Sequence, residues 1–358
     1  MKKSFCNNLG LYWYSPKIIA LSAIFSITLL FSFGLRQTYA GPKAADLVED
    51  GQSINLNQEK YVKLFQELKT EHYFTQRELD VIFSGQTIKK RVLELMDKPW
   101  EAKPYYQYSP HFLTQKSIEK GRMKLVEYKD TLDRVEKEIG VDREIVVAIW
   151  GVETRYGANQ GSYSVLQTLN TLFDAYPRRS KFFRKQLVHF LVLCKENGVD
   201  PKTIKGSYAG AFGQTQFIPS SFRAYAVSFD GDEKRDVWNS VPDVLASIAN
   251  YLKQYHWTLN GPIYAELGND LKDKRLIATN LKGRRGRIEW KTVRDVQNLD
   301  IPPSPENRKL SIVGLELPPE SGKKMRYVAG YPNFQAITEW NHSNRYAMAV
   351  TELSEALR

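Results

Sequence analysis

Residues 145–157 read IVVAIWGVETRYG, and the first eight of them are almost entirely apolar. Such a run predicts a helix from Arg143 to about Tyr156 that is buried over most of its surface. Glu153 lies at the end of the run. Burial penalises a charged carboxylate, so we expect a raised pKa for Glu153. A carboxylic acid that stays protonated near neutral pH is the general acid that glycoside cleavage needs. The same spacing also allows a structural ion pair with Arg155 or a lysine.

Apolar residues that recur three and four positions apart predict further helices on both sides of this run. These helices fall within 41–100 and at 117–140, 180–197, 240–252 and 346–357. A Tyr- and Pro-rich segment at 101–114 is typical of a loop. Near residue 259 the composition changes, and short alternating runs at 310–317 and 325–331 predict strands. The sequence therefore predicts a mainly α protein of the α+β class, whose last helix packs back on the earlier ones.

The composition narrows the class of protein. The chain has 358 residues, of which 42% are hydrophobic and 25% charged, and these proportions exclude disordered and low-complexity classes. Lysine and arginine total 51 against 40 acidic residues, and the net charge of +11 suits a polyanionic partner. The two cysteines, Cys6 and Cys194, are too few for a disulfide-dense fold or a thiolate metal cluster.

The first forty residues have the pattern of an export signal. Lys2 and Lys3 precede an apolar stretch at 18–35, and a small-residue pair follows at Ala40 and Gly41. This pattern predicts a signal peptide cleaved after Ala40. The apolar stretch is also long enough to remain as an uncleaved membrane anchor. Either outcome exports the rest of the chain, so we do not expect nucleic acid as a partner.

Two further features suit a carbohydrate ligand. Residues 205–221 contain three glycines, several serines and two glutamines, which indicates a loop with close backbone approaches and neutral hydrogen-bonding groups. A tight turn between helices explains the same composition. Several aromatic residues lie outside the core periodicity and match the flat apolar faces of sugar rings, although each alone is typical of a semi-buried aromatic. They are Tyr105, Tyr106, Tyr108, Tyr251, Trp340 and Tyr346.

An acidic segment contains a degraded calcium-loop pattern. Asp230, Asp232 and Asp243 have the right side-chain type, but Ser228 stands at the first ligand position and Glu233 where a glycine is needed. A polar turn before a helix cap at Ser240 explains these residues equally well. The five histidines have no metal-ligand spacing.

Taken together, these motifs resemble the B family of membrane-bound lytic murein transglycosylases, which is glycoside hydrolase family 103. The resemblance is carried in order by residues 151–157, 176–179, 205–221, 249–251, 331–334 and 341–350. It implies a lysozyme-like helical core at 116–258 with an N-terminal helical region at 41–115. It also implies a small β-containing insertion at 259–332 and a return to the core at 333–358.

The resemblance implies a reaction and a site. The reaction cleaves the MurNAc–GlcNAc bond of peptidoglycan without water and leaves a 1,6-anhydro-muramyl end. Glu153 falls on the acid/base position. Arg178 and Arg179 match a basic pair that meets stem-peptide carboxylates, and Trp340 stands where the family often has tyrosine. The other positions that line the glycan cleft are Tyr108, Ser207, Gln216, Tyr251, Asn341 and Tyr346.

The resemblance also implies a cellular setting. We expect a monomer in the periplasm of a Gram-negative bacterium, acting on glycan strands and joining complexes for wall synthesis or lysis. No cofactor is required by the reaction, and a structural Ca²⁺ at Asp230, Asp232 and Asp243 is the one metal to consider. Two other functions fit the sequence: a hydrolytic muramidase with a second acid, and a non-enzymatic wall-binding protein.

Overall fold

The computed structural model describes residues 43–97 and 103–358. The predicted signal peptide or anchor at 1–40 lies outside these residues. Within the described ranges, no helix has both the length and the apolar character needed to cross a bilayer.

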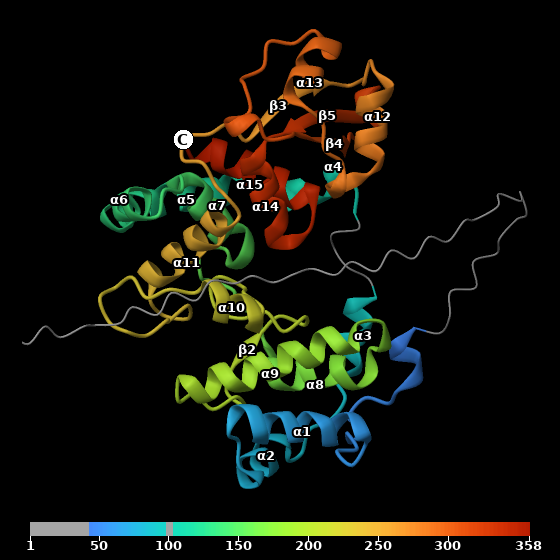
Figure 1. Ribbon diagram of the computed structural model, residues 1–358, viewed down its shortest axis with the longest axis vertical. Coiled ribbons are helices and arrows are strands. Elements are labelled where there is room, and N and C mark those ends of the chain that lie inside the picture. Colours follow the sequence, from blue (N-terminus) through green and yellow to red (C-terminus); the bar gives the residue numbers. More distant parts are fainter. Residues whose placement is uncertain (1–42, 98–102) are drawn as a thin grey trace, which may run out of the picture. The chain divides into compact units, whose positions relative to one another are not determined.

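The predicted fold class is confirmed, because the chain is mainly helical with two small antiparallel sheets (Figure 1). The helices are α1 (Glu59–His72), α2 (Gln76–Phe83), α3 (Lys90–Met96), α4 (Tyr105–Tyr108), α5 (Gln115–Glu127), α6 (Lys129–Glu138), α7 (Arg143–Thr154), α8 (Val165–Ala175), α9 (Ser180–Glu196), α10 (Pro219–Tyr225), α11 (Val241–Gln254), α12 (Lys274–Leu281), α13 (Trp290–Gln297), α14 (Pro332–Asn341) and α15 (Asn344–Leu357). The strands are β1 (Tyr163–Ser164), β2 (Lys205–Gly206), β3 (Tyr264–Gly268), β4 (Ser311–Glu316) and β5 (Met325–Gly330). Short 3₁₀ turns include η3 (Ser109–His111) and η4 (Pro177–Arg179).

Helix α7 is the buried helix that the apolar run predicts. Every side chain from Ile145 to Trp150 is at most 1% exposed, and the helix packs against α5, α11 and α15. It ends at Thr154, slightly before the predicted end. Arg155 and Tyr156 have left-handed backbone angles, φ 53° and 59°. A right-handed α-helix cannot continue through residues with such angles. This turn places Glu153 on the last turn of a helix whose position is fixed by the core.

Two local predictions are wrong. The single helix predicted at 117–140 is two helices, α5 and α6, because Tyr128 leaves the helical conformation (φ −108°, ψ 27°). Its ring packs edge-on against Trp150 of α7. The predicted loop at 101–114 contains α4, which follows Pro104, and η3, which begins at Ser109 with Pro110 in its first turn, where proline is tolerated.

The N-terminal helices pack on α8 and α9. Helix α1 contacts α9 and α3 contacts α8, and the ring of Tyr61 lies 5.0 Å from that of Phe173. These side chains belong to the same hydrophobic core as α7 and α15. The segment boundaries at 115 and 258 stay a prediction.

The strands predicted at 310–317 and 325–331 are present as β4 and β5. With β3 they form an antiparallel sheet in the order β3–β5–β4, in which Val313 pairs with Val328 (Figure 1). Helices α12 and α13 supply Leu276, Trp290 and Val293 to a second, smaller core beneath this sheet. The insertion is therefore mixed in structure, since helices as well as strands bury its apolar residues.

A set of charged hydrogen bonds joins the sheet to the C-terminal helix. Arg345 at the start of α15 donates to Glu316 of β4 over 3.1 Å, and Glu316 also accepts from the backbone N–H of Tyr105 over 3.0 Å. The Tyr105 hydroxyl donates to Glu352 of α15 over 2.5 Å. These bonds hold α15 at two points, Arg345 in its first turn and Glu352 in its second half.

The loop after β2 gives a stability prediction. A Cβ on Gly206 would lie 2.0 Å from the backbone carbonyl oxygen of Ala211. We expect Gly206→Ala to destabilise the protein by about 2–4 kcal/mol, because backbone cannot yield as a flexible side chain can. Thermal denaturation followed by circular dichroism measures this. The control is Gly198→Ala, where a Cβ meets no atom within 4 Å and any loss comes only from the left-handed φ of 63°. Equal losses of melting temperature would contradict the steric argument.

Candidate active site

The carboxylate of Glu153 is held by a residue from the other end of the chain. Glu153 is half-buried on the last turn of α7. Its Oε1 accepts a hydrogen bond of 2.6 Å from the hydroxyl of Tyr346 on α15. Hydrogen bonds to ionised groups are among the strongest in proteins and orient both partners. The contact therefore fixes one oxygen of the carboxylate.

Tyr346 is buried and stays protonated. Burial raises the pKa of its hydroxyl well above the ordinary value, and the neighbouring charge of Glu153 raises it further. Tyr108 and Tyr251 raise the same pKa further, so both lie within electrostatic range of Tyr346. Both of these rings are buried too. Tyr346 therefore serves as a permanent donor to Glu153 in a buried, tyrosine-rich surrounding.

Aromatic side chains continue from this point. The ring of Tyr251 lies 4.6 Å from that of Trp340 in an edge-on arrangement, and Trp340 lies 5.1 Å from Phe217. The Tyr251 hydroxyl donates to the backbone carbonyl of Glu339 over 2.7 Å. Trp340 stays partly exposed. The predicted aromatic residues of α11 and α14 thus form one cluster with an accessible edge.

In the predicted polar loop at 205–221, some side-chain groups are already bonded to nearby backbone groups. The Ser207 oxygen accepts from the backbone N–H groups of Ala209 and Ala211 over 3.3 and 3.1 Å, so its hydroxyl hydrogen points elsewhere. The Gln216 amide nitrogen donates to the carbonyls of Gln160 and Gly213 over 3.1 and 2.9 Å. Both side chains are partly exposed. Ser207 is left to donate and Gln216 to accept.

The remaining predicted cleft residues are less closely associated with Glu153. Arg178 forms an ion pair with Asp97, and Arg179 lies over the Phe182 ring at 4.3 Å. Both arginines are on η4, beside α8 and α9. Asn341 is exposed as the last residue of α14. Among the described contacts, none joins these three residues to Glu153.

Gln214 supports the site and was missed by the sequence analysis as an individual residue. Its side-chain oxygen accepts from the Trp150 indole N–H over 2.9 Å, and its backbone carbonyl accepts from the Thr154 hydroxyl over 3.1 Å. Trp150 and Thr154 are one turn apart on α7. Gln214 therefore joins the polar loop to the helix that carries Glu153. The sequence offered one sign of this support, since polar groups at 150 and 154 lie on the same face of the predicted helix.

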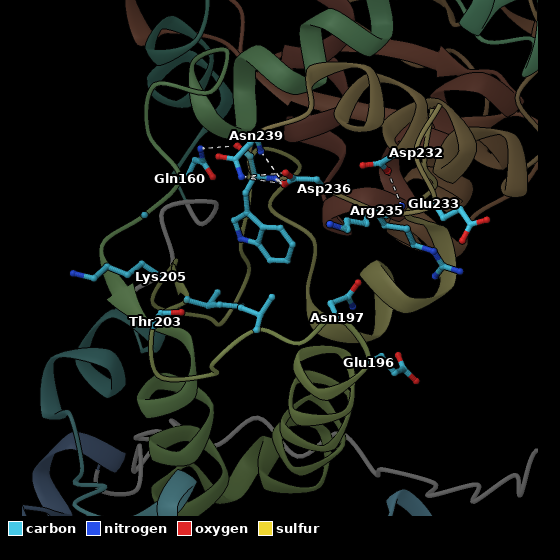
Figure 2. Close-up of a pocket in the computed structure, with 15 residues that line it drawn as sticks. Gln160, Glu196, Asn197, Thr203, Lys205, Asp232, Glu233, Arg235, Asp236 and Asn239 are labelled. Carbon is cyan, nitrogen blue, oxygen red and sulfur yellow. Dashed lines mark hydrogen bonds between the residues drawn. The ribbon is translucent and has the colours of Figure 1, made fainter. Parts of the chain in front are cut away.

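Two cavities lie near these elements. One, of about 680 Å³, is lined by Glu153 together with residues of α5 and the turn after α7. The larger, of about 1050 Å³, lies between the end of α9 and the acidic loop and does not include Glu153 (Figure 2). Trp238 is one of its lining residues. The lining mixes both signs of charge, such as Lys205 and Arg235 with Glu196 and Asp236.

The acidic loop fits calcium poorly. The two carboxylate oxygens of Asp243 accept the backbone N–H groups of Phe229 and Asp236 over 2.6 and 2.8 Å. Asp230 accepts from Asp232 N–H and from the Ser240 hydroxyl. Each of these oxygens already accepts a hydrogen bond within the loop, so an ion must share its remaining lone pair. Any role of calcium in this chain stays a prediction.

One other group of possible metal ligands is present among the described residues. Glu67, Glu71 and His72 approach one another on the surface of α1, a set that the histidine spacing did not indicate. Glu67 is ion-paired with Arg184. The group is partly exposed and lies on a different element from Glu153.

Residues 57–355 match the family described as Transglycosylase SLT domain. The chain belongs to this family. Membrane-bound lytic murein transglycosylase B of Escherichia coli (strain K12) is 34% identical over 296 residues, covering 80% of this chain and 79% of that protein. The expected membership of the lytic transglycosylases, enzymes that cleave peptidoglycan, is confirmed.

Solved structures agree with this assignment. Soluble lytic transglycosylase SltB1 from Pseudomonas aeruginosa matches with a TM-score of 0.74 and 35% identity, over 82% of this chain and 97% of that one. Escherichia coli Slt35 in complex with calcium matches with a TM-score of 0.73 and 31% identity, over 87% and 96%. Pseudomonas aeruginosa SltB3 in complex with NAG-NAM-pentapeptide matches with a TM-score of 0.70 and 31% identity, over 84% and 79%.

The contact between Tyr346 and Glu153 gives a prediction for this transglycosylase. We expect Tyr346→Phe to lower the rate of peptidoglycan cleavage about 10- to 100-fold, because it removes one charge-assisted hydrogen bond and keeps the ring. Release of soluble fragments from purified sacculi measures the rate. The control is Tyr264→Phe, which removes the hydroxyl that donates to Glu355 at 3.3 Å, away from Glu153. Equal rates in both variants would exclude this role for Tyr346.

The acidic loop gives a second prediction. We expect Ca²⁺ at about 1 mM to shift the melting temperature of the wild-type enzyme by less than about 1 °C. The Ser228→Asp variant should gain calcium-dependent stability, because it restores the missing carboxylate. Differential scanning calorimetry with magnesium as the control cation measures both. A large calcium shift in the wild type would show that the loop binds the ion despite its internal hydrogen bonds.

Proposed function

We propose that this transglycosylase cleaves the MurNAc–GlcNAc bond of peptidoglycan without water and leaves a 1,6-anhydro-muramyl end. The observation that supports this most directly is the lone carboxylate in its cavity. Glu153 is the only acid among the residues that line it. Retaining and inverting glycosidases ordinarily use two carboxylates flanking the bond. A reaction with one carboxylate needs a nucleophile from the substrate itself.

Glu153 acts first as an acid and then as a base. Its proton passes to the bridging oxygen, and the bond from that oxygen to C1 breaks. The acetamido group of the same sugar stabilises the positive charge at C1. The C6 hydroxyl then attacks C1 and gives its proton to the Glu153 carboxylate, so the acid is regenerated. Tyr346 keeps the carboxylate in one orientation throughout, since its own proton is not released.

Other residues bind and orient the sugar. The Ser207 hydroxyl is placed to donate, which suits the acetamido carbonyl, and the Gln216 side-chain oxygen is placed to accept from sugar hydroxyls. Tyr251 and Trp340 offer apolar faces for sugar rings. The pentapeptide-bearing disaccharide in the SltB3 structure supports glycan strands as the ligand of this chain as well.

We also propose a place in the cell. The pattern of residues 1–40 and the membrane-bound relative from Escherichia coli support export to the periplasm. There the enzyme meets its polymer directly. N-terminal sequencing of the exported form distinguishes cleavage after Ala40 from a retained anchor.

The Glu153→Gln variant tests the mechanism. It keeps the size of the side chain and an oxygen for Tyr346 but has no proton to transfer. We expect an unchanged melting temperature and a loss of at least about 10²–10⁴-fold in cleavage rate, the usual worth of an acid/base group. Mass spectrometry of the wild-type products supplies the second readout. Anhydro ends are expected, whereas ends that have gained the elements of water would indicate a hydrolytic muramidase. Full activity in Glu153→Gln would remove Glu153 from the mechanism.

A further inference from the structure

The cavity beside Glu153 is lined by more positively charged side chains than acidic ones. Lys116 and Lys120 of α5 and Arg155 of the turn after α7 all line it. Among the described residues, no carboxylate forms an ion pair with any of the three. The only acid in the lining is Glu153, which bonds Tyr346. Lys116, Lys120 and Arg155 form the cationic cluster.

Hydrogen bonds hold the cluster together in spite of its charge. The Lys120 ammonium donates to the backbone carbonyl of Arg155 over 2.8 Å and lies 5.6 Å from the Tyr156 ring centre. The Arg155 guanidinium lies 3.5 Å from the His111 ring nitrogen Nε2. Lys116 is exposed. The pKa of Lys120 is lowered, first by burial and then by the positive charges of Lys124 and Lys116. The negative charge of Glu127 has the smallest effect and raises this pKa.

The backbone at Arg155 adds a second cost. Its φ of 53° is left-handed, at a helix end where glycine is ordinarily found because it adopts this angle without strain. Arg155 therefore occupies a position whose backbone angle is more easily adopted by glycine. Repulsion within the cluster and strain at Arg155 both act against folding, so neither serves stability.

Some cations nearby are compensated by acids. Lys124 is ion-paired with Glu127, and Lys129 with Asp133. Of the predicted arginine pair, Arg178 is ion-paired with Asp97. The cavity in Figure 2 mixes acids with bases along its rim. The three cations of the cluster differ from these in lining the cavity that contains Glu153, where they outnumber the acids.

We propose that the cationic cluster binds a carboxylate of the acidic peptide that the muramyl sugar carries next to the bond that Glu153 cleaves. The inference rests on the proposed function, since it takes the substrate to be peptidoglycan. An ammonium pair and a guanidinium are the groups that bind carboxylates most strongly. Because the cluster and Glu153 line one cavity, the anion it binds must belong to the sugar at the reacting bond or to its neighbour.

The test compares two synthetic tetrasaccharides of alternating NAG and NAM. In one the stem peptides have free carboxylates, and in the other every peptide carboxylate is a carboxamide. We expect the wild-type enzyme to have a KM about five- to ten-fold lower for the free acid. Lys116→Glu should raise the KM for the free acid by about the same factor and leave the carboxamide unchanged. Lys116→Arg should restore the wild-type preference. Lys116 is chosen because it makes no hydrogen bond that folding needs.

Arg122→Glu is the matched control, because Arg122 is exposed on the same helix and does not line the cavity. It changes the net charge equally, so it measures general attraction to a polyanion. Equal KM values of the wild type for both tetrasaccharides would overturn the inference while leaving the proposed function intact. An equal KM increase in Lys116→Glu and Arg122→Glu would overturn it too. If the wild type cleaves neither tetrasaccharide, the proposed function fails and this inference fails with it.

Discussion

The hydrogen bond between the Tyr346 hydroxyl and the Glu153 carboxylate is the contact on which the site depends. It joins α15 to α7, two helices that also pack against each other in the core. Arg345, the residue before Tyr346, is held by Glu316 of the small sheet. The sheet and its helices have no described contact with the carboxylate, yet they fix the helix that does. The β-containing insertion therefore contributes to the geometry of a site built from helices.

Local patterns in the sequence were sufficient for α7 and for the position of Glu153. A long apolar run predicts a helix that is buried on all sides, and the single acid at its end is easily identified as a candidate site residue. The family resemblance supplied Tyr346 as a cleft residue, but no local pattern shows which carboxylate its hydroxyl meets. That contact depends on the packing of segments 193 residues apart. The break at Tyr128 was missed for a related reason, because the ring turns toward a tryptophan on another helix.

The distribution of charge was the least predictable part of the site. The adjacent arginines 178 and 179 were predicted to bind peptide carboxylates as a pair. Asp97, which forms an ion pair with Arg178, lies 81 residues earlier in the chain. The cationic cluster combines two lysines one helical turn apart with an arginine from a different element. The spacing of 116 and 120 was visible in the sequence, but the cavity that they line with Glu153 was not. Pairs such as Lys124 with Glu127 form within one helix, whereas the pair of Arg178 with Asp97 depends on tertiary structure.

Tyr346 lies on the last helix of the chain, and this has a consequence for biogenesis. Synthesis proceeds from the N-terminus, so α7 and its core neighbours emerge long before α15 exists to meet them. A partly made chain thus has Glu153 without its partner. The carboxylate reaches its final orientation only when α15 docks on α7, so assembly of the site is coupled to the completion of folding.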